Sequence, residues 1–222
     1  MKSNLLKQFA FVTIAILSLL GANSCKKNKN IVDTTPKVDS TLVTLYNTVT
    51  INNQYPGGAA FVDLDKGELY DMTSADYPDA IDHQDKIDAV YATFYNGLTV
   101  TTVFSNPNEY CSVSSQASTI LCTNQYNGIS KWTTKNNTQF ELTSITYSQL
   151  LQIKYNFQLD SAYNKAVADK PASKSSVSFL NSGEVYRFKT NLGKGLFVVS
   201  SATGTDNTLG ELIISILYLK DK

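Results

Sequence analysis

The chain has 222 residues, and its 19 basic and 19 acidic side chains give a formal net charge of zero at neutral pH. Arg187 is its only arginine and the lysines are scattered, which excludes the clustered positive charge that sequence-independent binding to nucleic acid needs. The 13 tyrosines and 10 phenylalanines favour strands. We therefore expect a mainly β protein with no nucleic-acid partner.

The first 24 residues have the pattern of a signal peptide. Lys2 and Lys7 precede an uncharged apolar run at Phe9–Leu20, which small residues follow. The run has 12 residues, fewer than the roughly 20 that a membrane-spanning helix requires. Residues 1–24 are therefore predicted to be removed on export, which leaves 17 basic and 19 acidic side chains and a net charge of −2.

The sequence Ala22-Asn23-Ser24-Cys25 resembles a bacterial lipobox, in which cleavage before the cysteine leaves that residue to carry lipid. The resemblance implies that Cys25 anchors the protein to a cell membrane, and we expect the outer membrane. An ordinary secretory signal with an incidental cysteine is the alternative. Residues 25–41 hold few apolar side chains, so they are predicted to be a flexible tether. Residues 42–222 are expected to form one domain.

Two further cysteines, Cys111 and Cys122, would be exported to a compartment that permits disulfides. We expect them to be bridged, because a two-thiolate metal site would have a shorter spacing and a nearby histidine. The bridge would contribute on the order of 3 kcal/mol by restricting the unfolded chain.

Alternation of apolar and polar residues predicts strands in the first half of the domain. These strands are 42–51, 59–64, 68–70, 87–94 and 98–104. Gly67 supplies the positive φ for one tight hairpin, and Asn96-Gly97 is a strong turn signal for a second. Hydroxyl and carboxylate caps at 73–76 suggest a short helix that Pro78 limits.

The second half of the domain is predicted to hold helices first and strands last. Helices are expected at 146–153 and 160–168, the latter opening on an Asp160-Ser161 cap, and strands at 185–188, 196–200 and 212–219. Sequential antiparallel strands with short turns bury one face against another sheet. The expected fold is therefore an antiparallel β-sandwich with short helices inserted in the middle region.

Several stretches carry a resemblance to known proteins. They are Ser24–Lys27, Phe61–Gly67, Lys86–Tyr91, Lys135–Phe140, Gly183–Thr190 and Gly193-Lys194. In these stretches and in the order of its segments, the chain resembles a group of uncharacterised Bacteroidota envelope lipoproteins. The matching residues are turn glycines and strand residues, so the resemblance implies a cellular location and a fold without specifying any chemistry.

More distantly, the layout is similar to the haem-capturing lipoproteins of the HmuY type, which are also mostly β. The resemblance implies iron held between two axial side chains, commonly histidine or methionine. The mature chain has one histidine, His83, and one methionine, Met72. A bis-histidine site within one subunit is excluded, and a His83/Met72 pair is the arrangement that the similarity leaves open.

Acidic residues form two candidate metal-binding patterns. Five aspartates recur at intervals of three residues, at Asp76, Asp79, Asp82, Asp85 and Asp88. Five carboxylates suit calcium, but the spacing also places them on a solvent-exposed face, and we favour that second interpretation. Asp63, Asp65 and Gly67 resemble the start of a calcium loop without its downstream glutamate, and a hairpin turn already explains them. The weak metal candidates are thus Asp63, Asp65, Asp82, His83 and Met72, and no cofactor is expected.

The middle of the domain, from about 106 to 170, mixes aromatic and polar residues with little periodicity. Irregular segments on a rigid scaffold often carry function, so Trp132 and Tyr126 are the candidate ligand-binding residues, with core packing as the alternative. The sequence has no G-x-S-x-G motif, and His83 would be the sole histidine base.

We therefore expect a cell-envelope lipoprotein that serves as a non-catalytic binding or structural module. Its partners would be the membrane, through the lipid anchor, and another envelope protein, a small ligand or a glycan. The alternatives are a haem or small-ligand carrier and, after it, a carbohydrate-active enzyme.

Overall fold

The computed structural model describes residues 39–54, 58–72, 76–95, 99–113, 121–123, 128–165, 174–205 and 208–221. The signal peptide, Cys25, most of the tether, the Asn96-Gly97 turn and Tyr126 lie outside these residues. Within them the fold is mainly β, with two antiparallel sheets of five strands and a few short helices, as the sequence predicts. No helix in the described ranges is long and apolar enough to cross a membrane.

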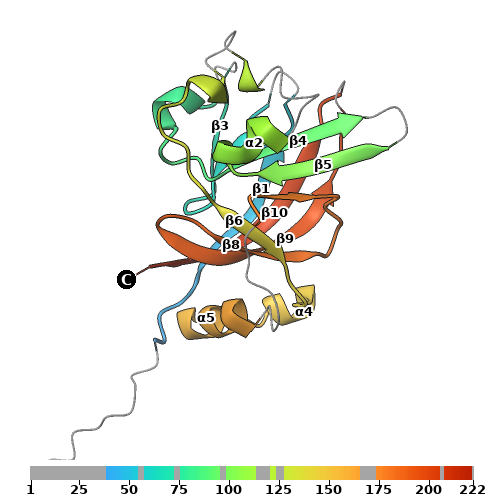
Figure 1. Ribbon diagram of the computed structural model, residues 1–222. Helices are drawn as coiled ribbons and strands as arrows, with labels where there is room; N and C mark the ends of the chain where they lie inside the picture. Colours follow the sequence, from blue (N-terminus) through green and yellow to red (C-terminus); the bar gives the residue numbers. More distant parts are fainter. Residues whose placement is uncertain are drawn as a thin grey trace, which may run out of the picture. The chain divides into compact units, whose positions relative to one another are not determined.

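The first sheet has the strand order β1-β10-β9-β8-β6 (Figure 1). Its strands are β1 (Thr44–Asn52), β10 (Glu211–Lys220), β9 (Gly193–Ala202), β8 (Val185–Lys189) and β6 (Gln139–Leu142). The hairpin of β9 and β10 forms its centre, with Lys220 opposite Gly193 at one end and Leu212 opposite Ala202 at the other. Strand β1 lies at the edge and pairs with β10 from Thr44 to Asn52.

The second sheet has the order β3-β2-β4-β5-β7. Its strands are β2 (Phe61–Asp63), β3 (Glu68–Tyr70), β4 (Ala89–Tyr95), β5 (Val100–Ser105) and β7 (Ser176–Ser178). Both predicted hairpins are confirmed, because β2 pairs with β3 and β4 pairs with β5 in antiparallel register. Strands β6 and β7 were not predicted; each is short and carries too few residues for alternation to show.

Aromatic packing joins the two sheets around Phe197 of β9, which is fully buried. Its ring centroid lies 5.5 Å from Phe104 of the second sheet, and 5.2 Å from Tyr186 and 6.3 Å from Phe188 of its own sheet. Phe140 of β6 contacts both Phe104 and Phe197. Because side chains alternate along a strand, the next residues on each side face outward into two further apolar clusters.

Helices cover the outer faces of the sheets. They are η1 (Ala80–His83), α2 (Pro107–Val113), η3 (Ile129–Lys131), α4 (Tyr147–Leu150) and α5 (Asn156–Lys165). Helices α4 and α5 lie together against the first sheet (Figure 1), where Leu150 and Leu159 pack on residues of β8, β9 and β10. Thr146 caps α4 through a capping box.

The start of α5 differs from its prediction. The helix begins at Asn156, so Asp160 and Ser161 lie inside it instead of capping it. The side chain of Gln158 accepts hydrogen bonds from the backbone N–H groups of Lys154 and Tyr155, at 2.8 and 3.2 Å, and thereby satisfies donors at the helix start. Asp160 forms an ion pair with Lys194 of β9 instead.

The expected disulfide is present between Cys111 of α2 and Cys122, with their Cα atoms 5.7 Å apart. It fastens residues 121–123 to α2 over the outer face of the second sheet, where Leu121 and Cys122 are buried.

Replacing Phe197 with alanine should lower the free energy of unfolding by about 3–5 kcal/mol, because a fully buried ring that touches several others leaves a cavity. Guanidinium-induced unfolding followed by circular dichroism measures the change. The matched control is Leu209→Ala, at a side chain that is 51% exposed, with an expected change within about 0.5 kcal/mol. Equal losses for the two variants would contradict the assigned core.

Candidate functional site

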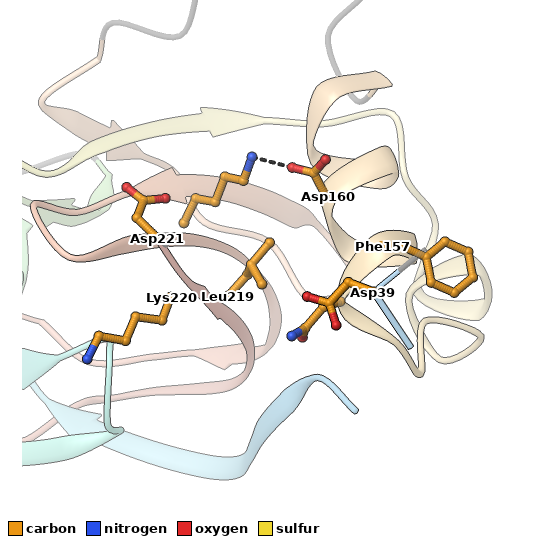
Figure 2. Close-up of a pocket in the computed structure, with 8 residues that line it drawn as sticks. Asp39, Phe157, Asp160, Leu219, Lys220 and Asp221 are labelled. Atoms are coloured by element: carbon orange, nitrogen blue, oxygen red, sulfur yellow. Dashed lines mark hydrogen bonds and ion pairs between the residues drawn. The ribbon is translucent and has the colours of Figure 1, made fainter. Parts of the chain in front are cut away.

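Among the hollows formed by the described residues, two contain carboxylate side chains. The first, of about 300 Å³, lies between α5 and the end of β10 (Figure 2). Two of its carboxylates are already in ion pairs, since Asp160 contacts Lys194 and Asp221 contacts Lys189. The second hollow, of about 490 Å³, contains an excess of carboxylates and is the stronger candidate.

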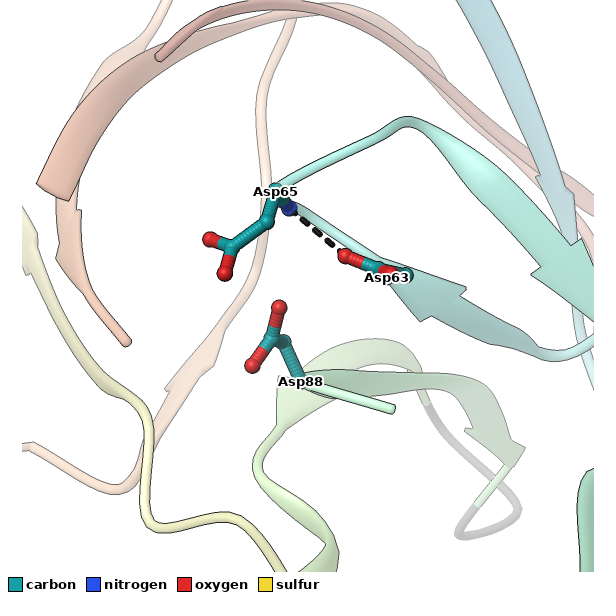
Figure 3. Close-up of side chains that lie close together, drawn as sticks. All are labelled: Asp63, Asp65 and Asp88. Atoms are coloured by element: carbon teal, nitrogen blue, oxygen red, sulfur yellow. Dashed lines mark hydrogen bonds between the residues drawn. The ribbon is translucent and has the colours of Figure 1, made fainter. Parts of the chain in front are cut away.

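The second hollow, here called the aspartate cleft, joins residues from both acidic patterns of the sequence. Asp63, Asp65 and Asp88 point toward one another (Figure 3), and each offers a carboxylate oxygen within 4.8 Å of the others. Asp63 ends β2, and Asp88 directly precedes β4. Val62 pairs with Ala89 in antiparallel register, so the next pair along the two strands is Asp63 and Asp88.

The β2–β3 turn brings Asp65 to the same place. The backbone N–H of Gly67 donates to the carbonyl of Asp63 at 2.7 Å, and Gly67 has a φ of +68°, which favours glycine. Within this tight turn the backbone N–H of Asp65 donates to Oδ1 of Asp63 at 2.9 Å. The turn therefore holds two carboxylates side by side, and the backbone N–H of Leu64 donates to Asp88 at 3.0 Å.

Residues outside the second sheet complete the cleft. Thr190, in the turn between β8 and β9, donates its hydroxyl hydrogen bond to Oδ1 of Asp65 at 2.9 Å. Thr138 and Asn136, which precede β6, donate to Oδ1 of Asp88 at 3.3 and 3.4 Å. Each of the three carboxylates is thus oriented by a hydrogen-bond donor before any ligand enters.

The aspartates are buried, with exposed fractions of 3% for Asp63, 8% for Asp65 and 2% for Asp88. Burial raises the pKa of Asp63 to about 6, and the neighbouring charge of Asp65 adds to the rise. Burial also raises the pKa of Asp65, and it raises that of Asp88 well above its usual range, helped by the charges of Asp65 and Asp63.

Positive charge in the cleft is limited. Lys66 Nζ lies 4.0 Å from Asp63 Oδ2, but its side chain is 52% exposed, so solvent screens the interaction. Three converging carboxylates of raised pKa can be stabilised by a bound proton or by a bound cation. Hard divalent cations such as calcium take six to eight oxygen ligands, and the remaining positions would be filled by water or by oxygens of a ligand.

The structure separates the metal candidates of the sequence. Asp63 and Asp65 line the cleft, whereas Asp82, His83 and Met72 do not line either hollow described here. Asp82 is exposed, the His83 ring packs 5.1 Å from the Tyr70 ring, and the half-buried Met72 packs on the outer face of the second sheet. A haem site at His83 and Met72 stays a prediction.

The regular run of aspartates is divided in the same way. Asp76, Asp79, Asp82 and Asp85 are exposed, in agreement with the solvated-face interpretation, and Asp88 is buried. From the sequence, Asp88 is identified only as a member of this run, although a carboxylate between Ile87 and Ala89 in an apolar strand is an unusual placement. No signal in the sequence pointed to Thr190 or Asn136.

The placement of Trp132 favours the alternative interpretation, core packing, over a ligand-binding role. Its side chain is 5% exposed, and its ring lies 5.3 Å from Phe61 within the apolar cluster on the outer face of the second sheet. The segment around Trp132 has no regular strand, so its sequence shows no alternation of apolar and polar residues. Trp132 directly follows η3, and its ring lies in the apolar cluster. Tyr126 lies outside the described residues.

The raised pKa values predict that stability falls as pH rises when no cation is present. A carboxyl group whose pKa is higher in the folded state binds more protons there, so folding is favoured at low pH. For Asp63 the fall should span pH 4 to 6, between its ordinary pKa of 3.8 and its folded value of about 6, and Asp65 and Asp88 act in the same direction.

Thermal unfolding at several pH values, in buffer that contains a chelator, measures this fall. Asp63→Asn should reduce the fall, whereas Asp82→Asn, which removes an exposed carboxylate outside the cleft, should retain it. A wild-type stability that rises steadily from pH 4 to 7 would show that the cluster does not hold its protons.

Comparison with known proteins adds no assignment to this site, which is therefore described from its geometry alone. The β-sandwich that the strand pattern predicts is present, whereas the resemblance to envelope lipoproteins and the haem-binding similarity stay predictions. No protein-family profile, no curated protein and no solved structure matches the chain.

Proposed function

We propose that this protein is a lipid-anchored cell-envelope protein whose β-sandwich domain serves as a non-catalytic binding module. The observation that carries the proposal is the pairing of cysteines. The Cys111–Cys122 disulfide is of the kind that persists in oxidising compartments outside the cytosol. It uses two of the three cysteines in the sequence, and the third, Cys25, follows the apolar run of the signal peptide where a lipid would be attached.

A binding role suits the aspartate cleft better than a catalytic one. Each of its three aspartates is at most 8% exposed and is oriented by hydrogen bonds from neighbouring segments. Such buried carboxylates are accessible to a small ion but offer little surface to a polymeric substrate. A hard divalent cation, calcium first, is the ligand class whose charge and preference for oxygen match the cleft.

Loss of the anchor is the test of cellular location. Cys25→Ala should move the protein from the membrane fraction to the soluble fraction, because no residue would then accept the lipid. The control is the double variant Cys111→Ala/Cys122→Ala, which removes the disulfide and keeps Cys25; it should stay with the membrane. Continued partitioning of Cys25→Ala into detergent would overturn the proposed anchor.

Cation binding is tested by thermal unfolding at pH 7.5 after chelator treatment. Calcium at 100 times its dissociation constant should stabilise the fold by about 2.7 kcal/mol. Asp88→Asn should abolish the increase in melting temperature, and the exposed-site control Asp82→Asn should keep it. If the melting temperature does not change with calcium, magnesium or manganese, the aspartate cleft does not bind these cations, and the proposed cation-binding role is wrong.

A further inference from the structure

The end of the domain that receives the tether carries a group of exposed apolar side chains. This tether-end patch consists of Leu42 (69% exposed), Tyr147 (52%), Leu151 (60%), Tyr155 (37%) and Phe157 (41%). These residues belong to the segment before β1, to α4, to the connection between α4 and α5, and to the first turn of α5. The inward-facing neighbours Leu150 and Leu159 already fill the core beneath the helices, so the patch is not needed to complete that core.

Hydrogen bonds fix the tether entrance to this patch. The backbone N–H of Val43 donates to the carbonyl of Lys154 at 3.0 Å, and that of Asn156 donates to Thr41 at 2.9 Å. Leu42 thereby forms an antiparallel bridge with Tyr155. The rings of Tyr155 and Phe157 stack with centroids 6.0 Å apart, and Phe157 also lines the edge of the charged hollow beside the patch (Figure 2).

We propose that the tether-end patch docks on the surface of the lipid bilayer that holds the anchor. The inference rests on the proposed lipidation of Cys25. Asp39, where the described domain begins, lies 14 positions after Cys25 in the sequence. The chain between these residues reaches at most about 48 Å when extended, and the flexible tether that the sequence predicts would have a mean span of about 20 Å.

This short span explains why a modest patch is sufficient. A site linked to its target by a short flexible chain meets it at an effective concentration on the order of millimolar. Weak insertion of a few side chains then holds the domain in place. Tyrosine, phenylalanine and leucine are suited to the boundary between headgroups and acyl chains, because their apolar bodies enter it while the tyrosine hydroxyl remains hydrated.

The opposite end of the same sheet provides a matched control surface. Leu209 is 51% exposed and precedes β10, whose residue Glu211 pairs with Asn52 at the far end of β1. Thr44, at the tether end of β1, pairs with Tyr218. The strand between these two pairs spans about 25–30 Å. A single tryptophan at either end therefore reports which end of the domain touches lipid.

The experiment uses the mature chain, residues 25–222, with Cys25 coupled chemically to a maleimide lipid in phosphatidylcholine vesicles that contain brominated phosphatidylcholine. Bromine quenches tryptophan that enters the bilayer, and the buried Trp132 gives a baseline common to all variants. After this baseline is subtracted, emission from Leu151→Trp should fall at least twofold relative to non-brominated vesicles. Emission from Leu209→Trp should not change.

A further variant tests whether the patch itself is responsible. Tyr155→Ser/Phe157→Ser in the Leu151→Trp background should abolish the quenching while the circular dichroism spectrum stays unchanged. Persistent quenching in that variant, equal quenching at Leu209→Trp, or no quenching at Leu151→Trp would each overturn the proposal. A concentration-dependent blue shift of Leu151→Trp without vesicles would also overturn it, because a second copy of the chain would then cover the patch.

Chemical attachment of the lipid to Cys25 allows the docking proposal to be tested independently of the proposed lipidation. Because the lipid is supplied chemically, the quenching result does not depend on lipidation in the cell. Failure of the anchor appears only in the fractionation of Cys25→Ala, and failure of docking appears only in the vesicle experiment.

Discussion

Aromatic rings from both sheets meet around Phe197, and this apolar contact holds the two layers of the sandwich together. Beyond the rings, toward the β2–β3 and β8–β9 turns, polar contacts take over. There the hydroxyl of Thr190 donates to Asp65 across the gap between the sheets. The aspartate cleft therefore depends on the core, because the apolar packing places buried carboxylates and their donors opposite one another.

The outer faces of the sheets are covered in two different ways. Helices α4 and α5 cover the first sheet, and the disulfide-linked segment with η3 covers much of the second. Both coverings rest on apolar contacts, with Leu159 on one side and Trp132 on the other as buried members. The aspartate cleft lies between the turns at one end, where neither covering reaches, and this position leaves it open to small solutes.

The elements that could be predicted from the sequence are those whose own residues show a local pattern, such as alternation of apolar and polar residues or a turn glycine. Strands with one face on the core show alternation, and Gly67 marks a turn through a conformation that few other residues adopt. The start of α5 escaped prediction because it depends on the hydrogen bond from Asn156 to Thr41, far away in the sequence. The cleft escaped prediction because Asp88 lies 23 or more positions from Asp65 and Asp63 in the sequence and meets them through the pairing of β2 with β4, which no local pattern encodes.

The attachment of the tether has a mechanical consequence. Strand β1 lies at the edge of its sheet and has β10 as its partner there, so a pull on the N-terminal side loads a single ladder of hydrogen bonds. The bonds from Val43 to Lys154 and from Asn156 to Thr41 lie between that pull and the start of the strand. If the proposed lipid anchor pulls on the chain, these two bonds would transfer load to the segment at α5 before the pairing of β1 with β10 is loaded.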